Sequence, residues 1–241
     1  MAITVGIFGI SGTGKTSSLF VNEEGVPPSK DFTLEQLEAH GINPEDSVFI
    51  NADMKALPIR RGPTSKWVKD KNYFETSNTD EILSLVKGIG AGTKMKRVFI
   101  DTVNAMMIDK EMVESKNKLT FDKWADLAKS VYEIIYTANS LRPDLIIYFM
   151  GHVTLYTDVD GNESKCLVTN GRKLEKIKLE SKLPIVLFTT VERDGNGNNK
   201  YYFETQSNRS TAKTPMGMFD DFKIPNSLLL VDKTIRAYYG I

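Results

Sequence analysis

The segment from Gly9 to Thr16 reads GISGTGKT and fits the pattern G-x-x-x-x-G-K-[ST]. It directly follows Ile3–Phe8, a β-branched and aromatic run that is typical of a buried strand. Glycines at these positions let backbone N–H groups curl around phosphate oxygens, and the positive end of a following helix points at the same anion. The segment therefore predicts a phosphate-binding loop between a strand and a helix. The competing interpretation is a glycine-rich turn that only caps a helix.

The predicted loop gives its polar residues distinct tasks. Lys15 is expected to reach the β- and γ-phosphates of a nucleotide, and the Thr16 hydroxyl to bind Mg²⁺. The other nucleotide contacts are expected from Gly9, Ser11, Gly12, Thr13, Gly14 and Ser17.

Strand and helix patterns alternate along the first part of the chain. Further buried strands are expected over residues 47–51, 97–101 and 145–150. Helices are expected over residues 15–20, 79–87 and 120–139. Two hairpins, turning near residues 160–162 and 194–197, and a weak helical pattern over 225–239 follow. The pattern predicts a single α/β domain over residues 1–241: a mainly parallel sheet flanked by helices to about residue 152, then antiparallel hairpins over about 153–241.

Polar residues follow three of the predicted strands, at the sheet edge where ligands bind in α/β folds. Asp101 ends the strand at 97–101 and is expected to hold Mg²⁺ together with Thr16. Asp53 is a candidate for orienting an attacking water, and His152 for sensing the γ-phosphate. Asp53 could equally be a turn residue, and His152 a structural imidazole, so both alternatives stay open.

The phosphate loop and the segments at residues 49–53, 99–103 and 149–152 together resemble, in order, the core strands of RecA-type recombinase ATPases. More closely, residues 53–58 and 211–219 resemble the compact phage-encoded RecA-like ATPases linked to single-strand annealing, the Sak-type group. The resemblance implies a RecA-like fold that hydrolyses ATP with Mg²⁺. It puts Asp53 where the family has a catalytic glutamate, and His152 where the family has a sensing glutamine.

The same resemblance implies partners. It suggests that the protein acts on single-stranded DNA in phage recombination, annealing or replication, with a phage single-strand-binding protein as a further partner. It implies self-association into a ring or filament-like oligomer, in which Lys213, near the family's interface lysines, would meet a neighbour's γ-phosphate. The competing interpretation of Lys213 is a surface lysine on an edge strand, which discourages aggregation. The expected location is the cytoplasm of a bacterial host.

Two basic stretches are candidates for the DNA contact. The formal net charge is zero, with 31 basic and 31 acidic residues, so any grip on nucleic acid must be local. Residues 55–71 carry six basic side chains around Trp67, with Tyr73 just after, and residues 164–182 carry six more. Basic groups with interleaved aromatics are typical of single-strand binding. The competing interpretation is a solvated, lysine-rich surface.

Other features narrow the class of protein. The only cysteine is Cys166, which excludes an intrachain disulfide and favours a reducing compartment. No apolar run approaches the roughly 18 residues that a membrane span needs, and no signal peptide is evident, so no membrane contact is expected. Two alternatives to an ATPase remain open: a small-molecule, nucleotide-type P-loop kinase, and a nucleotide-gated binding module with little turnover.

Overall fold

The computed structural model describes all residues except 59–64, 114–119, 158–160, 162 and 170–177. A central sheet has the strand order β10-β9-β8-β1-β5-β4-β2-β3. Its parallel strands are β1 Ile3–Phe8, β2 Ser47–Asn51, β3 Tyr73–Phe74, β4 Arg97–Asp101, β5 Ile146–Gly151 and β8 Ile185–Arg193. Its antiparallel strands are β9 Asn199–Glu204 and β10 Lys223–Pro225. A separate hairpin joins β6 Val153–Thr157 to β7 Glu163–Leu167.

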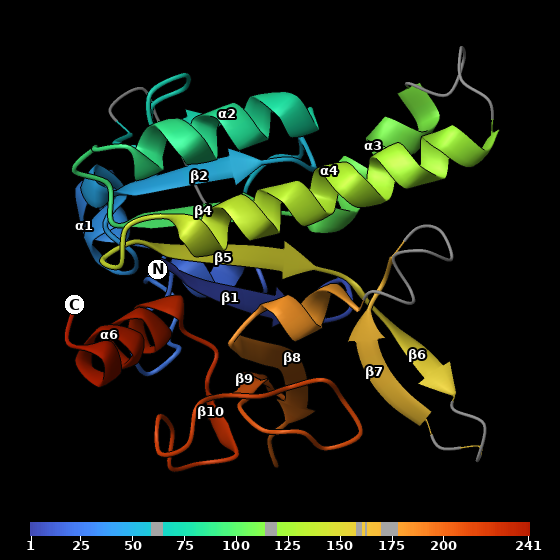
Figure 1. Cartoon of the computed structure of the whole chain (residues 1–241). Helices are drawn as coiled ribbons and strands as arrows, with labels where there is room; N and C mark the ends of the chain where they lie inside the picture. The colour runs from blue at the N-terminus through green and yellow to red at the C-terminus, as the bar shows by residue number, and fades with distance from the viewer. Residues whose placement is uncertain (59–64, 114–119, 158–160, 162, 170–177) are drawn as a thin grey trace.

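Helices cover both faces of this sheet (Figure 1). The α-helices are α1 Leu34–Ala39, α2 Thr79–Gly90, α3 Val103–Val113, α4 Thr120–Ser140 and α6 Leu228–Tyr239. Short 3₁₀ turns are η1 Ser17–Leu19, η2 Pro44–Asp46 and η4 Leu179–Lys182. This arrangement confirms the predicted α/β class, with a mainly parallel sheet, flanking helices and antiparallel C-terminal strands. In the part of the chain that is described, no helix is long and apolar enough to cross a bilayer.

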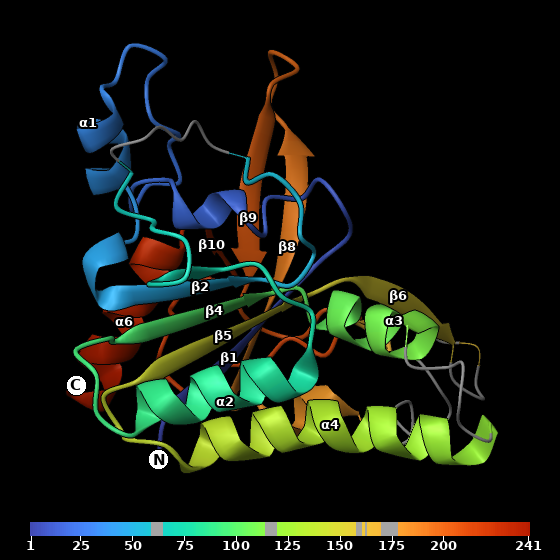
Figure 2. The same ribbon diagram turned by 90° about the horizontal axis from the view of Figure 1, so that it is seen from above.

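Strand alternation divides the core into two layers. Val98 and Ile100 of β4 point to the face covered by α2, α3 and α4, which Figure 2 shows along one side of the sheet. Phe99 points to the other face, where it stacks on Tyr148 with 4.8 Å between ring centroids. That second face is covered by η1 and α6. Both faces are buried, so the parallel strands read as continuous apolar runs, and the four predicted core strands are confirmed.

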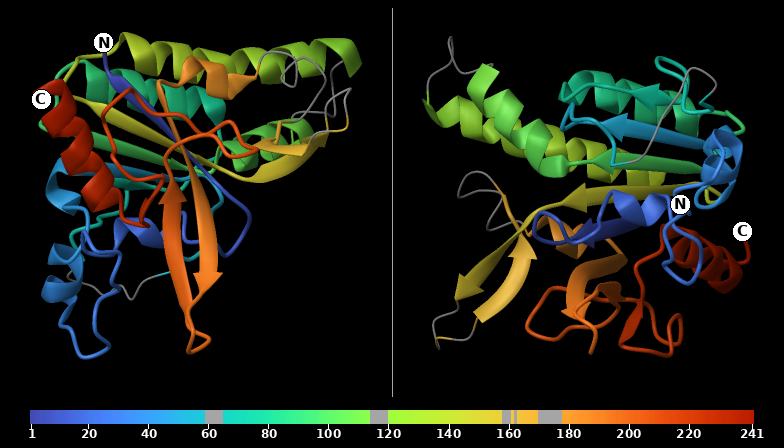
Figure 3. Two further views of the ribbon diagram at one scale, coloured as in Figure 1. Left: turned by 90° about the horizontal axis from the view of Figure 1, so that it is seen from below. Right: turned by 180° about the vertical axis from the view of Figure 1, so that it is seen from behind.

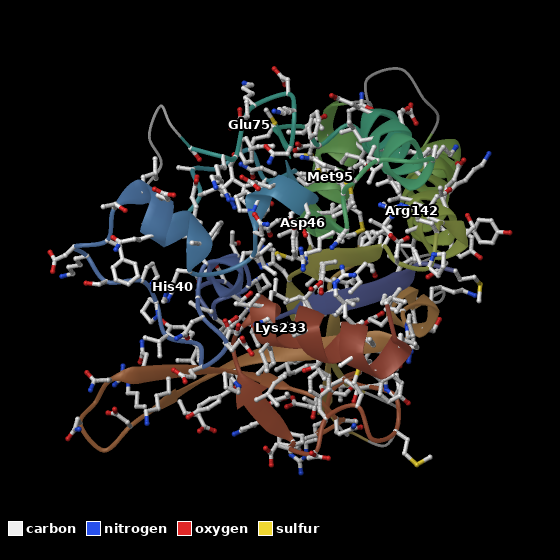
Figure 4. The ribbon with its side chains drawn as sticks, turned by 90° about the vertical axis from the view of Figure 1, so that its left-hand side faces the viewer. His40, Asp46, Glu75, Met95, Arg142 and Lys233 are labelled. Carbon is white, nitrogen blue, oxygen red and sulfur yellow. The ribbon has the colours of Figure 1, made fainter. Side chains whose placement is uncertain are left out.

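A buried ion-pair network closes the amino end of the sheet. Asp232 of α6 is fully buried and accepts hydrogen bonds from Arg97 at 2.7 Å, Arg236 at 2.9 Å and the Tyr148 hydroxyl at 3.1 Å. Arg97 also reaches Asp46, which is labelled at this end of the molecule in Figure 4. The network anchors α6 to β4 and β5 and leaves the opposite, carboxyl edge of the strands for a ligand.

Some local predictions were wrong in extent. The helix expected over residues 15–20 is only the single 3₁₀ turn η1. The Ser18 hydroxyl donates to the Lys15 carbonyl at 2.5 Å, a side-chain bond that competes with α-helical hydrogen bonding. Helix α3 was not predicted, because its apolar residues do not share one face: Met106 and Met107 are buried, whereas Ile108 and Met112 are exposed.

Candidate phosphate-binding site

The carboxyl ends of β1, β2, β4 and β5 meet at one edge of the sheet. In register, Asn51 lies beside Asp101 and Phe8 lies beside Gly151. The loops beyond these ends are tied together by backbone bonds: Gly9 N donates to Gly151 O at 3.1 Å, and Asp53 N donates to Asp101 O at 3.1 Å. Segments distant in sequence therefore converge on the residues that follow each strand.

The loop after β1 needs its glycines. Gly12 and Gly14 have φ values of +81° and +92°, a region that side-chain-bearing residues rarely occupy. At Gly9 the requirement is close packing, because a Cβ atom would lie 1.7 Å from the Thr189 Oγ1 atom. That same hydroxyl lies 2.5 Å from Thr13 Oγ1. Strand β8 thus supports the loop through Thr189, which packs against Gly9 and contacts the Thr13 hydroxyl. The sequence analysis did not identify this residue.

The Lys15 ammonium lies at the centre of the site. Its Nζ atom donates to the carbonyl oxygens of Gly9 at 2.8 Å and Ile10 at 2.9 Å, and lies 3.4 Å from His152 Nδ1. Burial lowers the pKa of Lys15, and the nearby carboxylates of Asp101 and Asp53 oppose that effect. The side chain is therefore a buried cation held within reach of three strand ends.

Thr16 and Asp101 form the candidate Mg²⁺ site. The Thr16 hydroxyl donates to Asp101 Oδ2 at 2.5 Å, so the two oxygens are adjacent in the cleft that Lys15 also lines. Burial raises the pKa of Asp101 to about 6; the bond from Thr16 opposes this effect, and the Asp53 charge adds to it. Hard oxygen ligands suit Mg²⁺, which commonly uses one or two carboxylates and completes its shell with phosphates and water. A Mg²⁺ ion held in this way needs few protein ligands. In the described residues there is no cluster of three or more His, Cys, Asp or Glu residues that could hold a metal ion.

Asp53 is held by contacts to both carboxylate oxygens. Its Oδ2 atom lies 2.9 Å from Lys55 Nζ, and its Oδ1 accepts from the Thr102 hydroxyl at 2.8 Å. The Asn51 side chain holds the turn that runs from Asn51 to Lys55, because it donates to the Lys55 carbonyl at 2.7 Å and to the Tyr73 hydroxyl at 2.8 Å. Asp53 is thus a positioned carboxylate that lines the cleft, and both roles weighed for it, water-orienting base and turn residue, fit this geometry.

Replacing Asp53 with asparagine separates those roles. If the carboxylate orients the attacking water, Asp53→Asn is expected to keep ATP affinity within several-fold and to slow hydrolysis at least about tenfold, because an amide is a poor proton acceptor. Phosphate-release kinetics and equilibrium nucleotide binding measure the two quantities. An unchanged hydrolysis rate in the folded variant would identify Asp53 as a turn residue.

His152 connects the site to the β6–β7 hairpin. Its backbone N–H donates to Asn104 Oδ1 at 2.6 Å, and the Asn104 amide donates onward to the Val168 carbonyl at 2.8 Å. The Val168 N–H returns to the His152 carbonyl at 2.8 Å. Burial and the Lys15 charge lower the pKa of His152, so the imidazole is neutral at neutral pH. Asn104, also missed in the sequence, therefore links the imidazole segment to the base of the hairpin.

These groups line a cleft of about 280 Å³. Its lining contains these predicted site residues: Ser11, Gly12, Gly14, Lys15, Thr16, Ser17, Asp53, Asp101 and His152. Gly9 and Thr13 do not line the cleft; both pack against Thr189 of β8. Lys213 does not line the cleft; its backbone pairs with Val186 of β8, and its half-buried side chain lies outside the site of its own chain.

The prediction that the aromatic residues of the first basic stretch stack on nucleic-acid bases was wrong. Trp67 and Tyr73 are each only 2% exposed, and both pack on Phe49, so they are unavailable for base stacking. Lys66 and Lys69 form ion pairs with acidic neighbours. The basic residues Arg60, Arg61, Arg172, Lys173 and Lys176 lie outside the described residues.

No protein-family model matches the chain, and no curated protein matches it. Among solved structures, it is similar to the KaiC-like protein PH0186 from the hyperthermophilic archaeon Pyrococcus horikoshii OT3. The two are 16% identical with a TM-score of 0.45, over 83% of this chain and 76% of that chain. The roles of the site residues therefore rest on the geometry described above.

Proposed function

We propose that this protein is a Mg²⁺-dependent nucleoside triphosphatase that binds and hydrolyses ATP at the cleft after β1. The observation that carries the proposal is the 2.5 Å contact between the Thr16 hydroxyl and the Asp101 carboxylate beside the Lys15 ammonium. A buried cation and two hard oxygen ligands in one cleft, beside a glycine-rich loop, match the requirements of phosphoryl transfer.

Each residue would contribute one part of the reaction. The loop amides and Lys15 would hold the β- and γ-phosphates and stabilise charge that develops on the transferred group. Thr16 and Asp101 would hold Mg²⁺, which when bound supplies the charge that neutralises the phosphate oxygens. Asp53 would orient the attacking water, and the neutral imidazole of His152, next to Lys15, would respond to the γ-phosphate.

The finer proposal is that hydrolysis is coupled to single-stranded DNA. The β6–β7 hairpin, which begins directly after His152, projects from the body of the protein (Figures 1 and 3). It exposes Leu155 and Tyr156, and Lys178 lies over the Tyr156 ring at 5.4 Å. An exposed aromatic with a nearby cation suits a flexible nucleic-acid strand. Together with the resemblance to annealing ATPases, this supports a role in phage recombination, annealing or replication.

One experiment separates the competing functions. Phosphate release from Mg²⁺-ATP is measured alone, with single-stranded DNA, and with a panel of nucleoside and nucleotide acceptors. We expect turnover that single-stranded DNA stimulates. Phosphate transfer to an acceptor would instead support a kinase, and nucleotide-dependent DNA binding without turnover would support a gated binding module.

We further propose that the active site is completed by Lys213 of a neighbouring copy. The supporting observation is that Lys213 lies outside the cleft of its own chain and keeps a partly exposed side chain. The rate per chain is then expected to rise with protein concentration, and Lys213→Ala to lower it while a Lys223→Ala control does not. Mixing Lys213→Ala with Lys15→Ala should restore some activity, since one mixed interface pairs an intact loop with an intact lysine. A concentration-independent rate without rescue on mixing, with assembly shown separately, would contradict this proposal.

A further inference from the structure

A second groove adjoins the phosphate cleft on the side of β9. It has a volume of about 540 Å³ and lies between the segment at residues 21–27 and strands β9 and β10. Ser17 and Tyr201 line both this groove and the phosphate cleft, so the two spaces border each other at these residues. Figures 2 and 3 show the β8–β9 hairpin beside the N-terminal segments that follow β1. A ligand whose phosphates occupy the loop could therefore extend into this groove.

Tyr201 offers an aromatic surface where the two spaces meet. A Cβ atom at Gly14 would lie 3.2 Å from the Tyr201 ring, so the ring is next to the phosphate loop itself. On β9, Tyr201 shares a face with the buried Phe203, the face that η1 covers. Tyr201 is nevertheless 40% exposed. An open ring beside a phosphate loop can stack with a planar base.

Asn226 also lines the groove, and its side chain carries a buried hydrogen-bond donor. The residue is only 4% exposed, and no acceptor in the described part of the chain receives a bond from its Nδ2 atom. The oxygen of the same amide lies close to the loop, since Asn226 Oδ1 is 2.8 Å from the position of a Gly14 Cβ. Leaving a buried donor unpaired is unfavourable, so its retention points to an acceptor that arrives with a ligand.

The opposite wall of the groove is a preformed loop. Asn22 Oδ1 accepts from Glu24 N at 3.1 Å and Val26 N at 2.8 Å, and Asn22 N donates to the Val26 carbonyl at 3.1 Å. Gly25 packs against the end of β10, where a Cβ atom would lie 3.3 Å from Pro225. The groove thus has a hydrogen-bonded wall on one side and strand residues on the other, and a ligand would find it largely formed.

We propose that this groove binds the nucleoside half of the nucleotide, with Tyr201 stacking on the base and the Asn226 amide donating to a ring nitrogen or carbonyl of that base. The inference rests on the proposed nucleotide site and deepens it. It makes Tyr201 and Asn226 determinants of nucleoside recognition, separate from the residues that hold phosphate.

The test compares ATP with inorganic tripolyphosphate, which carries the phosphates without a nucleoside. Binding of each with Mg²⁺ is measured by calorimetry for the wild type and for Tyr201→Ala, Tyr201→Phe and Asn226→Ala. The matched control is Tyr239→Ala, since Tyr239 is 41% exposed and lies on α6, away from both spaces. Thermal melting confirms that each variant is folded.

We expect Tyr201→Ala to weaken ATP binding between about fivefold and a hundredfold, while tripolyphosphate binding is unchanged. Tyr201→Phe should retain wild-type affinity, because it keeps the ring. Asn226→Ala, which loses the donor without adding a charge beside the phosphate loop, should also weaken ATP alone; if it fails to fold, the Tyr201 pair decides. Equal affinity of ATP for wild type and Tyr201→Ala, or equal losses for both ligands, would overturn the inference and leave the phosphate site intact. Failure of both ligands to bind the wild type would overturn the proposed function itself.

Discussion

Replacing Lys15 with alanine is expected to lower the rate of ATP hydrolysis at least about a hundredfold. The Lys15 ammonium is buried and held by the carbonyls of Gly9 and Ile10, with Asp101 and Asp53 nearby. Because water is largely excluded there, its charge acts strongly on phosphate oxygens. Among the described residues, the only other lysine that lines the cleft is Lys55, and Lys55 is paired with Asp53.

Phosphate release by purified variants measures this effect. Lys66→Ala is the matched control, because Lys66 is an exposed lysine paired with Glu45 outside the cleft. It should hydrolyse ATP at the wild-type rate. Wild-type activity in folded Lys15→Ala would contradict the proposal that this cleft hydrolyses ATP.

Asp101→Asn is expected to abolish Mg²⁺-dependent turnover and, at the same time, to stabilise the nucleotide-free protein. The loss of turnover follows because an amide binds Mg²⁺ far more weakly than a carboxylate. The gain in stability follows from the pKa of Asp101, which burial raises from 3.8 to about 6. The folded state therefore disfavours the ionised carboxylate, so stability falls as the pH rises from about 4 to about 6 and stays lower above that range.

The stability change has a size and a pH window. At pH 8 the substitution should raise the free energy of unfolding by an amount on the order of 2 to 3 kcal/mol. Well below the unfolded-state pKa of 3.8 the wild-type carboxylate is protonated in both states, and the gain should vanish. Asparagine can still accept the bond from Thr16, so the local packing is kept. Urea denaturation at the two pH values measures the difference. An equal change at both would show that burial of the charge is not its cause.

Features of the fold that depend on local sequence were predictable. The core strands are continuous apolar runs because both faces of the sheet are buried. The glycines after β1 could be predicted because the loop requires positive φ angles there. The hairpins at β6–β7 and β8–β9 follow from their turn residues. The grouping of Lys15, Thr16 and Asp101 could also be predicted, because the carboxyl ends of parallel strands lie at one edge of a sheet.

Contacts between distant segments could not be predicted. The Thr13–Thr189 bond joins residues 176 positions apart, and neither residue type in isolation signals it. Asn226 meets Gly14 only because β10 and the loop after it return to the phosphate loop. Trp67 looked like a stacking residue within a basic run, but packing on Phe49 decides its burial, and a charge pattern does not encode that contact.

The most direct test of a Mg²⁺-nucleotide site at the β1 loop is calorimetric titration of wild-type protein with a non-hydrolysable ATP analogue, with and without Mg²⁺. The account predicts one site per chain, tighter binding with Mg²⁺ than without it, and loss of the Mg²⁺ dependence in Asp101→Asn. No binding at millimolar analogue, or binding that neither Mg²⁺ nor Asp101→Asn alters, would contradict it.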